Sequence, residues 1–297
     1  MGQIREVVYG LLDTAQQRLA AELLCMVPCT EDWRPEGMPC INLDHITDNH
    51  AVADEGWSFF DDLRNKWPID GRKWMGQQLF TNNSIKEQFG VDGCSGGLNP
   101  DTIETYLRWL KRWKEGILAL VHMSAGAPAC ATELVSIQQV NGKNARSHRG
   151  ILIDQGMVAF VTSYHKGFSA SQEPMCVYRF VPQEAGEFVV YHLWLVDPFG
   201  SRGQTVFSPW LWEPAPEEEW EEEEGEWGEG EDGIAVESTP DVPDDSAEAQ
   251  FVERQTAKTE ARNCNGFWET NRIRWVMRRE TSKRIDIAIR TSDWRQA

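Results

Sequence analysis

Two stretches of the chain mix basic side chains with tryptophan, as proteins that contact nucleic-acid phosphates often do. One lies within residues 108–114 and the other within residues 272–284. Their cations are Arg108, Lys111, Arg112, Lys114, Arg272, Arg274, Arg278, Arg279, Lys283 and Arg284. The alternative is that both stretches are solvated helix faces, with Trp109 and Trp113 packed in the core. On these residues alone, contact with duplex DNA and a solvated helix face both stay open.

Other groups with chemical potential fit known sites less well. Cys25, Cys29 and Cys40, with His45 and His50, could be drawn as a zinc site, but their spacing matches no compact zinc-finger pattern. No G-x-x-x-x-G-K-[ST] motif occurs, so the chain has no P-loop for ATP. We therefore expect neither a metal nor a cofactor.

Helical periodicity predicts most of the elements that would position these groups. Apolar residues recur with helical spacing over residues 3–24, 101–123 and 182–196, and a basic helix is predicted over 267–280. Asn99 or Asp101 can cap the second of these helices, and Pro182 suits the first position of the third. Shorter helices are predicted at 56–65, 74–80 and 131–138.

A β-hairpin is predicted between the helices. The apolar runs Ile151–Ile153 and Met157–Thr162 flank Asp154-Gln155-Gly156, where the glycine can adopt the turn conformation. Residues 177–181 are predicted to add a third strand. The fold class is therefore mainly α with a small β-hairpin sheet, that is, α+β.

Charge divides the chain into parts. Of the net charge of −18, the 17 acidic residues between Glu213 and Glu248 account for almost all, so the remainder carries about −1. Low-complexity acidic sequence cannot bury enough apolar surface to fold, so residues 213–250 are predicted to be a disordered insertion. Trp220 and Trp227 within it could dock a protein partner. The chain has no apolar run long enough to span a membrane and no signal-peptide core, so no membrane association is expected.

Several motifs occur together between residues 126 and 199. They are Gly126-Ala127-Pro128-Ala129, Glu133-Leu134, Ile153-Asp154-Gln155-Gly156, Phe160-Val161-Thr162, Tyr164-His165-Lys166-Gly167 and most of Val189–Phe199. In this order they resemble the fungal tyrosine-recombinase-like region associated with telomere-linked RecQ-type helicase proteins. The resemblance covers most of residues 1–200 and, more faintly, 267–290.

The resemblance implies a two-lobed DNA strand-transfer fold and roles for individual residues. In such enzymes an arginine at a helix start holds the scissile phosphate, a hairpin lysine acts as general acid and a late tyrosine attacks. It points to Glu133 and Lys166 as vestigial catalytic residues. The implied phosphate contacts are Lys166, Arg179, Arg274, Arg278, Arg279 and Arg284.

Three of the roles that the resemblance implies have no matching residue. Cys130 stands where the first arginine is expected, and a thiol cannot form a bidentate contact with phosphate. No histidine follows His192, and no tyrosine follows Tyr191. The expected strand-transfer site is therefore degenerate.

Our interpretation is a four-part chain. Residues 1–115 would form a helical core-binding-like domain, 116–212 the recombinase-like core, 213–250 the acidic insertion and 251–297 the basic remainder. The predicted function is a catalytically impaired, nuclear, DNA-binding remnant of a mobile-element or subtelomeric protein. The alternatives are an interaction protein that uses its acidic tract, a non-functional fragment, and an enzyme with a relocated nucleophile such as Tyr164 or Tyr191.

Overall fold

The computed structural model describes residues 2–28, 33–89, 98–126, 128–142, 148–162, 176–200, 211–212, 268, 270–289, 291 and 294. These residues form mainly helices and one three-stranded antiparallel sheet. The predicted α+β class is therefore confirmed. Lys166, Tyr164 and the acidic tract 213–250 lie outside the described residues.

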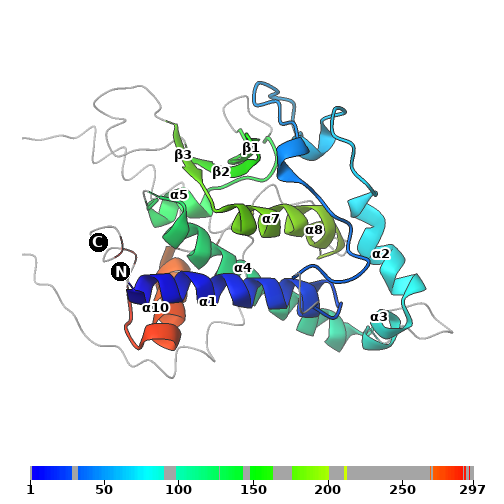
Figure 1. Cartoon of the computed structure of the whole chain (residues 1–297), viewed down its shortest axis with the longest axis horizontal. Coiled ribbons are helices and arrows are strands. Elements are labelled where there is room, and N and C mark those ends of the chain that lie inside the picture. The colour runs from blue at the N-terminus through cyan, green and yellow to red at the C-terminus, as the bar shows by residue number, and fades with distance from the viewer. Residues whose placement is uncertain are drawn as a thin grey trace, which may run out of the picture.

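Two long helices form the base of the molecule (Figure 1). Helix α1 (Gly2–Arg18) continues into a π-helix (Leu19–Leu23), and buries Val7, Leu11 and Ala15 at four-residue intervals. Helix α4 (Pro100–Ser124) packs along α1. Because the predicted spacing matches the buried stripe of α1, this part of the fold follows directly from the sequence.

Helix α4 starts where the sequence predicts. The Asn99 side chain accepts a hydrogen bond from the Asp101 backbone N–H at 2.9 Å, and Pro100 occupies the first turn. Every residue from Ile117 to Met123 is buried. Helix α4 also runs across the predicted domain boundary at residues 115/116, and one apolar cluster joins residues on both sides of that boundary.

The sheet has the strand order β1-β2-β3, formed by β1 (Ile151–Asp154), β2 (Met157–Thr162) and β3 (Val177–Phe180). Gln155 and Gly156 make the β1–β2 turn, both with positive φ (49° and 76°). The positive φ of Gly156 favours glycine, and a Cβ atom there would lie 2.0 Å from Asp44 Oδ1 and would displace that carboxylate. The predicted hairpin and third strand are confirmed.

A buried helical layer lies between the sheet and the base. It consists of α7 (Gln183–Tyr191), a π-helix (His192–Val196) and α8 (Asp197–Gly200), and residues 185–197 are all buried (Figure 1). Pro182 is the residue before the helix and not its first residue, which differs by one position from the prediction. The layer is apolar nearly all round because it is covered on two sides.

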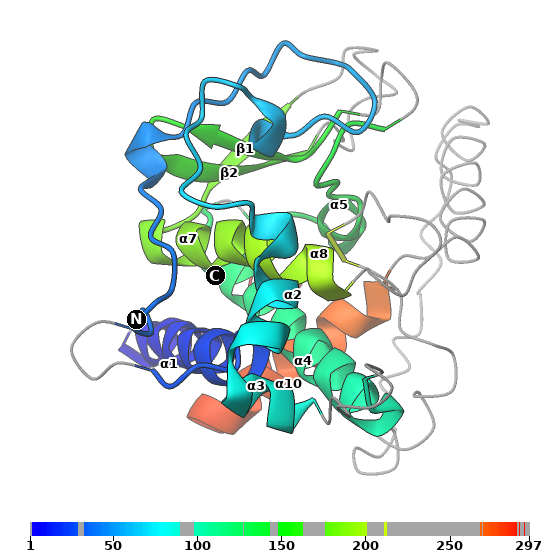
Figure 2. The ribbon, with the colours of Figure 1, turned by 90° about the vertical axis from the view of Figure 1, so that its right-hand side faces the viewer.

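The segment from residue 33 to residue 89 wraps the side of this layer and ends in α2 (Gly71–Thr81) and α3 (Asn83–Gln88) (Figure 2). Arg149 before β1 holds the segment through a buried ion pair with Asp48, and the Asp48 carboxylate also accepts from the Ile153 N–H at 2.9 Å. The predicted helix at 56–65 is wrong: only Phe59–Asp61 form one 3-10 turn. The Asp61 carboxylate bonds back to Ser58 and closes that turn.

The last described helix, α10 (Thr270–Ile285), lies across α1 and α4 and also contacts the short helix α5 (Ala131–Val135) (Figure 2). The C-terminal basic stretch is therefore part of the folded body. Within the described ranges, no helix is both long and apolar enough to cross a membrane.

The close packing of Gly71 against the buried layer gives a test of the fold. A Cβ atom on Gly71 would lie 2.2 Å from the Trp194 ring and 2.6 Å from the Trp194 carbonyl oxygen. We expect Gly71→Ala to lower the free energy of unfolding by about 3 kcal/mol, measured by urea denaturation.

Gly116→Ala is the matched control, because nothing lies within 4 Å of its Cβ position in the middle of α4. It should stabilise the protein by up to about 1 kcal/mol. Equal effects of the two variants would contradict the packing of α2 on Trp194.

Candidate functional site

The helix start that carries Cys130 and Glu133 is a capping structure. Cys130 is the residue before α5, and Glu133 lies three positions further on. Glu133 Oε2 accepts a hydrogen bond from the Cys130 backbone N–H at 3.1 Å. A carboxylate in the first turn of a helix is stabilised by the free N–H groups there. Glu133 therefore has a structural role at this helix start.

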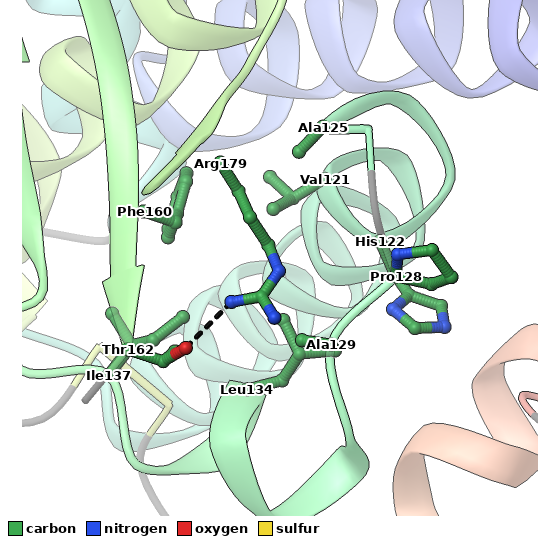
Figure 3. Close-up of a pocket in the computed structure, with 10 residues that line it drawn as sticks. All are labelled: Val121, His122, Ala125, Pro128, Ala129, Leu134, Ile137, Phe160, Thr162 and Arg179. Atoms are coloured by element: carbon green, nitrogen blue, oxygen red, sulfur yellow. Dashed lines mark hydrogen bonds between the residues drawn. The ribbon is translucent and has the colours of Figure 1, made fainter. Parts of the chain in front are cut away.

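The same carboxylate binds Arg179, which reaches it from β3. Arg179 Nη2 lies 2.9 Å from Glu133 Oε2, and Arg179 Nη1 donates to Thr162 Oγ1 at 2.7 Å (Figure 3). Both charged side chains are only 8% exposed. The structure thus brings two of the predicted site residues, Glu133 and Arg179, together as a buried ion pair.

The pocket around Arg179 is small and mostly apolar. Its wall comes from the end of α4, the start of α5 and strands β2 and β3, and includes Val121, Ala129, Leu134 and Phe160 (Figure 3). Its volume is about 10 Å³, roughly the space of a single water molecule. A phosphodiester cannot enter this pocket unless the elements around it separate.

Three of the C-terminal arginines also bind internal carboxylates. Arg272 and Arg279 both bind Glu115, which is buried in α4, with Arg279 Nη1 at 2.7 Å from Glu115 Oε2. Arg279 also binds Glu280, and Arg284 binds both Glu280 and Thr14 Oγ1 of α1. These contacts attach α10 to α4 and α1. Two of the predicted phosphate contacts, Arg279 and Arg284, are therefore engaged within the protein.

Electrostatics agree with this arrangement. Burial acts to raise the pKa of Glu280, but the ion pairs and hydrogen bonds with Arg279 and Arg284 outweigh it and lower that pKa below its usual value. The carboxylate is thus ionised at neutral pH and pairs with both arginines. The network lies at the junction of α10 with α1, where removal of one partner would leave a charge without compensation.

The remaining basic residues divide into exposed and buried ones. Arg274 and Arg278 are exposed one turn apart on α10, and Arg108 and Arg112 are exposed on α4. Lys114, which the sequence placed among the surface cations, is buried with its Nζ 3.9 Å from Asp197 Oδ1. Trp113 is also buried and donates to the Ala15 carbonyl oxygen at 2.9 Å. Of the implied phosphate contacts that the structure describes, Arg274 and Arg278 are the accessible ones.

The other candidate groups are dispersed. Lys166 and Tyr164 lie outside the described residues, and Tyr191 is buried with its hydroxyl oxygen accepting from the Ile41 N–H at 3.2 Å. Burial raises the pKa of the Cys25 thiol to about 12. In the part of the chain that the structure covers, no three His, Cys, Asp or Glu side chains are grouped so that they could hold a metal ion.

The sequence analysis missed the carboxylates that engage the arginines. Glu115 and Asp48 are the most important, because each joins segments about 100 or more residues apart. The signal for Glu115 was its place in α4 directly before the apolar run that starts at Ile117. A charge at such a position is buried more easily with a partner than alone, and that partner can only come from elsewhere in the fold.

His192, in the π-helix of the buried layer, is another buried ionisable group. Its ring packs against Trp113 with a centroid distance of 4.9 Å, and neither ring nitrogen has a hydrogen-bond partner among the described residues. Burial, with the nearby charge of Lys114, lowers the pKa of His192 well below its usual value. The imidazole is therefore neutral in the folded protein, as expected for a core residue.

Removing one member of the Arg179 pair should be costly. We expect Arg179→Leu to lower the free energy of unfolding by about 3 kcal/mol, because the Glu133 carboxylate loses its buried partner. The double variant Arg179→Leu/Glu133→Gln should be more stable than Arg179→Leu alone, since no unpaired charge remains. Urea denaturation of the four proteins of this cycle measures the coupling. Arg278→Leu, at an exposed position, is the control and should change stability by less than about 0.5 kcal/mol. If the changes in the free energy of unfolding from the two substitutions simply add, the Arg179–Glu133 ion pair is contradicted.

The neutral state of His192 predicts a dependence of stability on pH. Below about pH 6.5 the imidazole binds a proton in the unfolded chain but not in the folded protein. The unfolded state then holds more protons, so stability falls as the pH drops from about 6.5 to 5, by up to about 1.4 kcal/mol per pH unit. Thermal denaturation across this range should show a smaller loss for His192→Phe. His45→Gln, at an exposed position, should lose as much stability as the wild type over this pH range. A pH profile of stability for His192→Phe identical to that of the wild type would refute the neutral state of His192.

The chain was compared with protein-family models, with curated proteins and with solved structures, and no match was found in any of the three. The recombinase-like family thus stays a proposal that depends on the motifs between residues 126 and 199.

Proposed function

We propose that this protein is a catalytically impaired, recombinase-like protein of mobile-element or subtelomeric origin that binds duplex DNA in the nucleus. The proposed fold is the two-lobed recombinase-like architecture. Its support is the order of elements: α5 with its Cys130 start, then the three-stranded sheet, then the buried α7 layer. The motifs Glu133-Leu134, Ile153–Gly156, Phe160–Thr162 and Val189–Phe199 fall on these elements in the same order, and Tyr164–Gly167 lies outside the described residues.

Support for the loss of catalysis comes from the corner around Arg179. Cys130 cannot make the charged, forked contact that an arginine would make with a phosphate. Arg179 contacts Glu133 and Thr162, and the adjacent space is about 10 Å³. Strand transfer needs several cations around the reacting phosphate. Among the described residues, this corner offers no cation to a ligand unless the Arg179–Glu133 pair is first broken.

The observation that carries the DNA proposal is the exposure of Arg274 and Arg278 on a firmly held helix. Their neighbours Arg272 and Arg279 fix α10 to Glu115 of α4, so the two exposed guanidinium groups project from a rigid support. Helix α10 packs directly on α4, whose exposed cations are Arg108 and Arg112. Cations held one turn apart suit contacts with successive backbone phosphates, which confer affinity without sequence preference.

Fluorescence anisotropy with a labelled 30-base-pair duplex tests this surface. We expect Arg274→Ala/Arg278→Ala to weaken binding about tenfold and to reduce the slope of log affinity against log salt by about two. Lys66→Ala/Lys86→Ala removes the same charge from another part of the protein and is the matched control. A version without residues 213–250 should bind more tightly, because the acidic tract competes electrostatically with DNA.

Two results would contradict the proposal. One is the absence of binding by both the full chain and the deletion variant, with circular dichroism confirming that each is folded. The other is an equal loss of affinity in the Arg274/Arg278 variant and its control. In addition, incubation with a nicked duplex should yield no covalent protein–DNA species. A covalent species would instead favour the enzyme with a relocated tyrosine.

A further inference from the structure

A large cleft among the described residues shares no lining residue with the pocket around Arg179. It has a volume of about 940 Å³, which is within the range of about 300–1,000 Å³ usual for ligand pockets. Its walls come from residues 56–72, residues 139–140 and the buried layer at residues 193–198. Figure 2 shows α2 and α8 side by side at this part of the molecule.

One wall of the cleft is aromatic. The rings of Phe60 and Trp67 have a centroid distance of 5.0 Å, and those of Trp67 and Trp194 a distance of 5.1 Å, so three rings form one continuous surface. Gly71 fits against the Trp194 ring and fixes it in place. Such a surface attracts a cation to the ring faces, and a planar guanidinium group can also stack on them.

The charged side chains that line the cleft are mostly acidic. Four are aspartates, and Arg72 is the single cation among the lining residues: Asp61, Asp62, Asp70, Asp197 and Arg72. A cleft with an excess of one charge concentrates ligands of the opposite charge. The negative charge and the aromatic wall are separate features of the lining, and each of them favours a cation as the ligand.

Two of these aspartates can accept a ligand at small cost. Asp61 pairs with Arg72 at 3.0 Å and Asp70 with Lys73 at 2.9 Å, and both cations are 70% exposed. Exposed ion pairs of this kind contribute little to stability. Replacing Arg72 or Lys73 by a ligand cation therefore costs little free energy. Asp197 differs, because it is buried beside Lys114 and serves the core.

Trp67 adds a donor that a ligand could use. Its indole Nε1–H is buried and has no acceptor within the described part of the chain. Buried donors are normally paired, so an unpaired one at the wall of a cleft points to an acceptor supplied by a ligand. A peptide offers such an acceptor in its backbone carbonyl oxygen.

We propose that this cleft binds a segment of a partner protein that carries an arginine side chain. The guanidinium group would lie against Trp67 and Phe60 and pair with Asp61 and Asp70. A backbone carbonyl oxygen of the segment would accept from Trp67 Nε1–H after the indole turns toward the cleft, because this nitrogen is buried in the structure. The proposal is independent of DNA binding, which uses cations on α4 and α10.

The probes are two acetylated pentapeptides that contain glycine except at the centre, where one has arginine and the other citrulline. Citrulline keeps the shape of arginine but has no charge. Calorimetric titration of the full-length protein should show binding of the arginine peptide and at least fivefold weaker binding of the citrulline peptide, as expected for the loss of two weak ion pairs. The indole N–H resonance of Trp67, assigned in NMR spectra with Trp67→Phe, should shift on addition of the arginine peptide.

Matched variants make the test specific. Asp61→Asn/Asp70→Asn should weaken binding of the arginine peptide about tenfold, because each side chain keeps its shape and one acceptor oxygen while two charges are removed. Glu6→Gln/Asp13→Asn removes two exposed charges from α1, which contributes no residue to the cleft, and should keep the affinity within about twofold of wild type. Arg274→Ala/Arg278→Ala should also bind the peptide normally.

Three outcomes would overturn the proposal. They are no binding of the arginine peptide at millimolar concentration, equal affinity for the two peptides, and equal weakening by the cleft variant and its control. Equal affinity for the two peptides would assign the cleft to neutral ligands. Circular dichroism and thermal denaturation of each variant exclude loss of folding as the cause of weaker binding.

Discussion

The buried carboxylate of Glu115 is the interaction on which the arrangement of the helices depends. It lies in the middle of α4 and accepts hydrogen bonds from Arg272 and Arg279, more than 150 residues further along the chain. A charge at this depth is tolerated only when it is paired and hydrogen-bonded. The pairing therefore specifies where α10 must lie, and α10 in turn covers α1 through Arg284.

The same principle recurs at the sheet. Glu133 and Arg179 join α5 to β3, while Asp48 and Arg149 join the 33–89 segment to the start of β1. In each case a buried charge links elements that are distant in sequence, and each pair is sheltered by apolar neighbours. Hydrophobic burial stabilises the body as a whole, but it is not directional. The ion pairs add geometric constraints that apolar packing alone does not provide.

This use of arginine limits what the protein can do with its positive charge. A guanidinium group that binds a buried carboxylate is unavailable to a phosphate, so the basic composition of residues 272–284 overstates the surface charge. The cations that remain accessible form a small set on the outer sides of α4 and α10. A separate cleft, lined by residues 56–72, 139–140 and 193–198, has an acidic and aromatic lining. The body thus has a small set of exposed cations and, apart from it, an acidic cleft.

The sequence by itself determined the local elements. The helical spacing of apolar residues over 3–24 predicted α1, Asn99 or Asp101 was predicted to cap α4, and Gly156 marked the hairpin turn. These features depend on contacts between near neighbours, such as caps, turns and one-sided apolar stripes, and they are therefore visible in a single sequence. The helix predicted at 56–65 failed because side-chain bonds from Asp61 and Asn65 closed local turns there.

Only the tertiary structure decided which charged residues are available. The sequence of α10 does not show that Arg279 pairs with Glu115 while the adjacent Arg278 stays exposed, because that carboxylate lies on another helix. Lys114 and Arg179 likewise became internal residues through partners on other elements. The cleft also needed three separate segments to meet. Such long-range pairings are set by how the elements pack together, and a periodic pattern within one element contains no information about them.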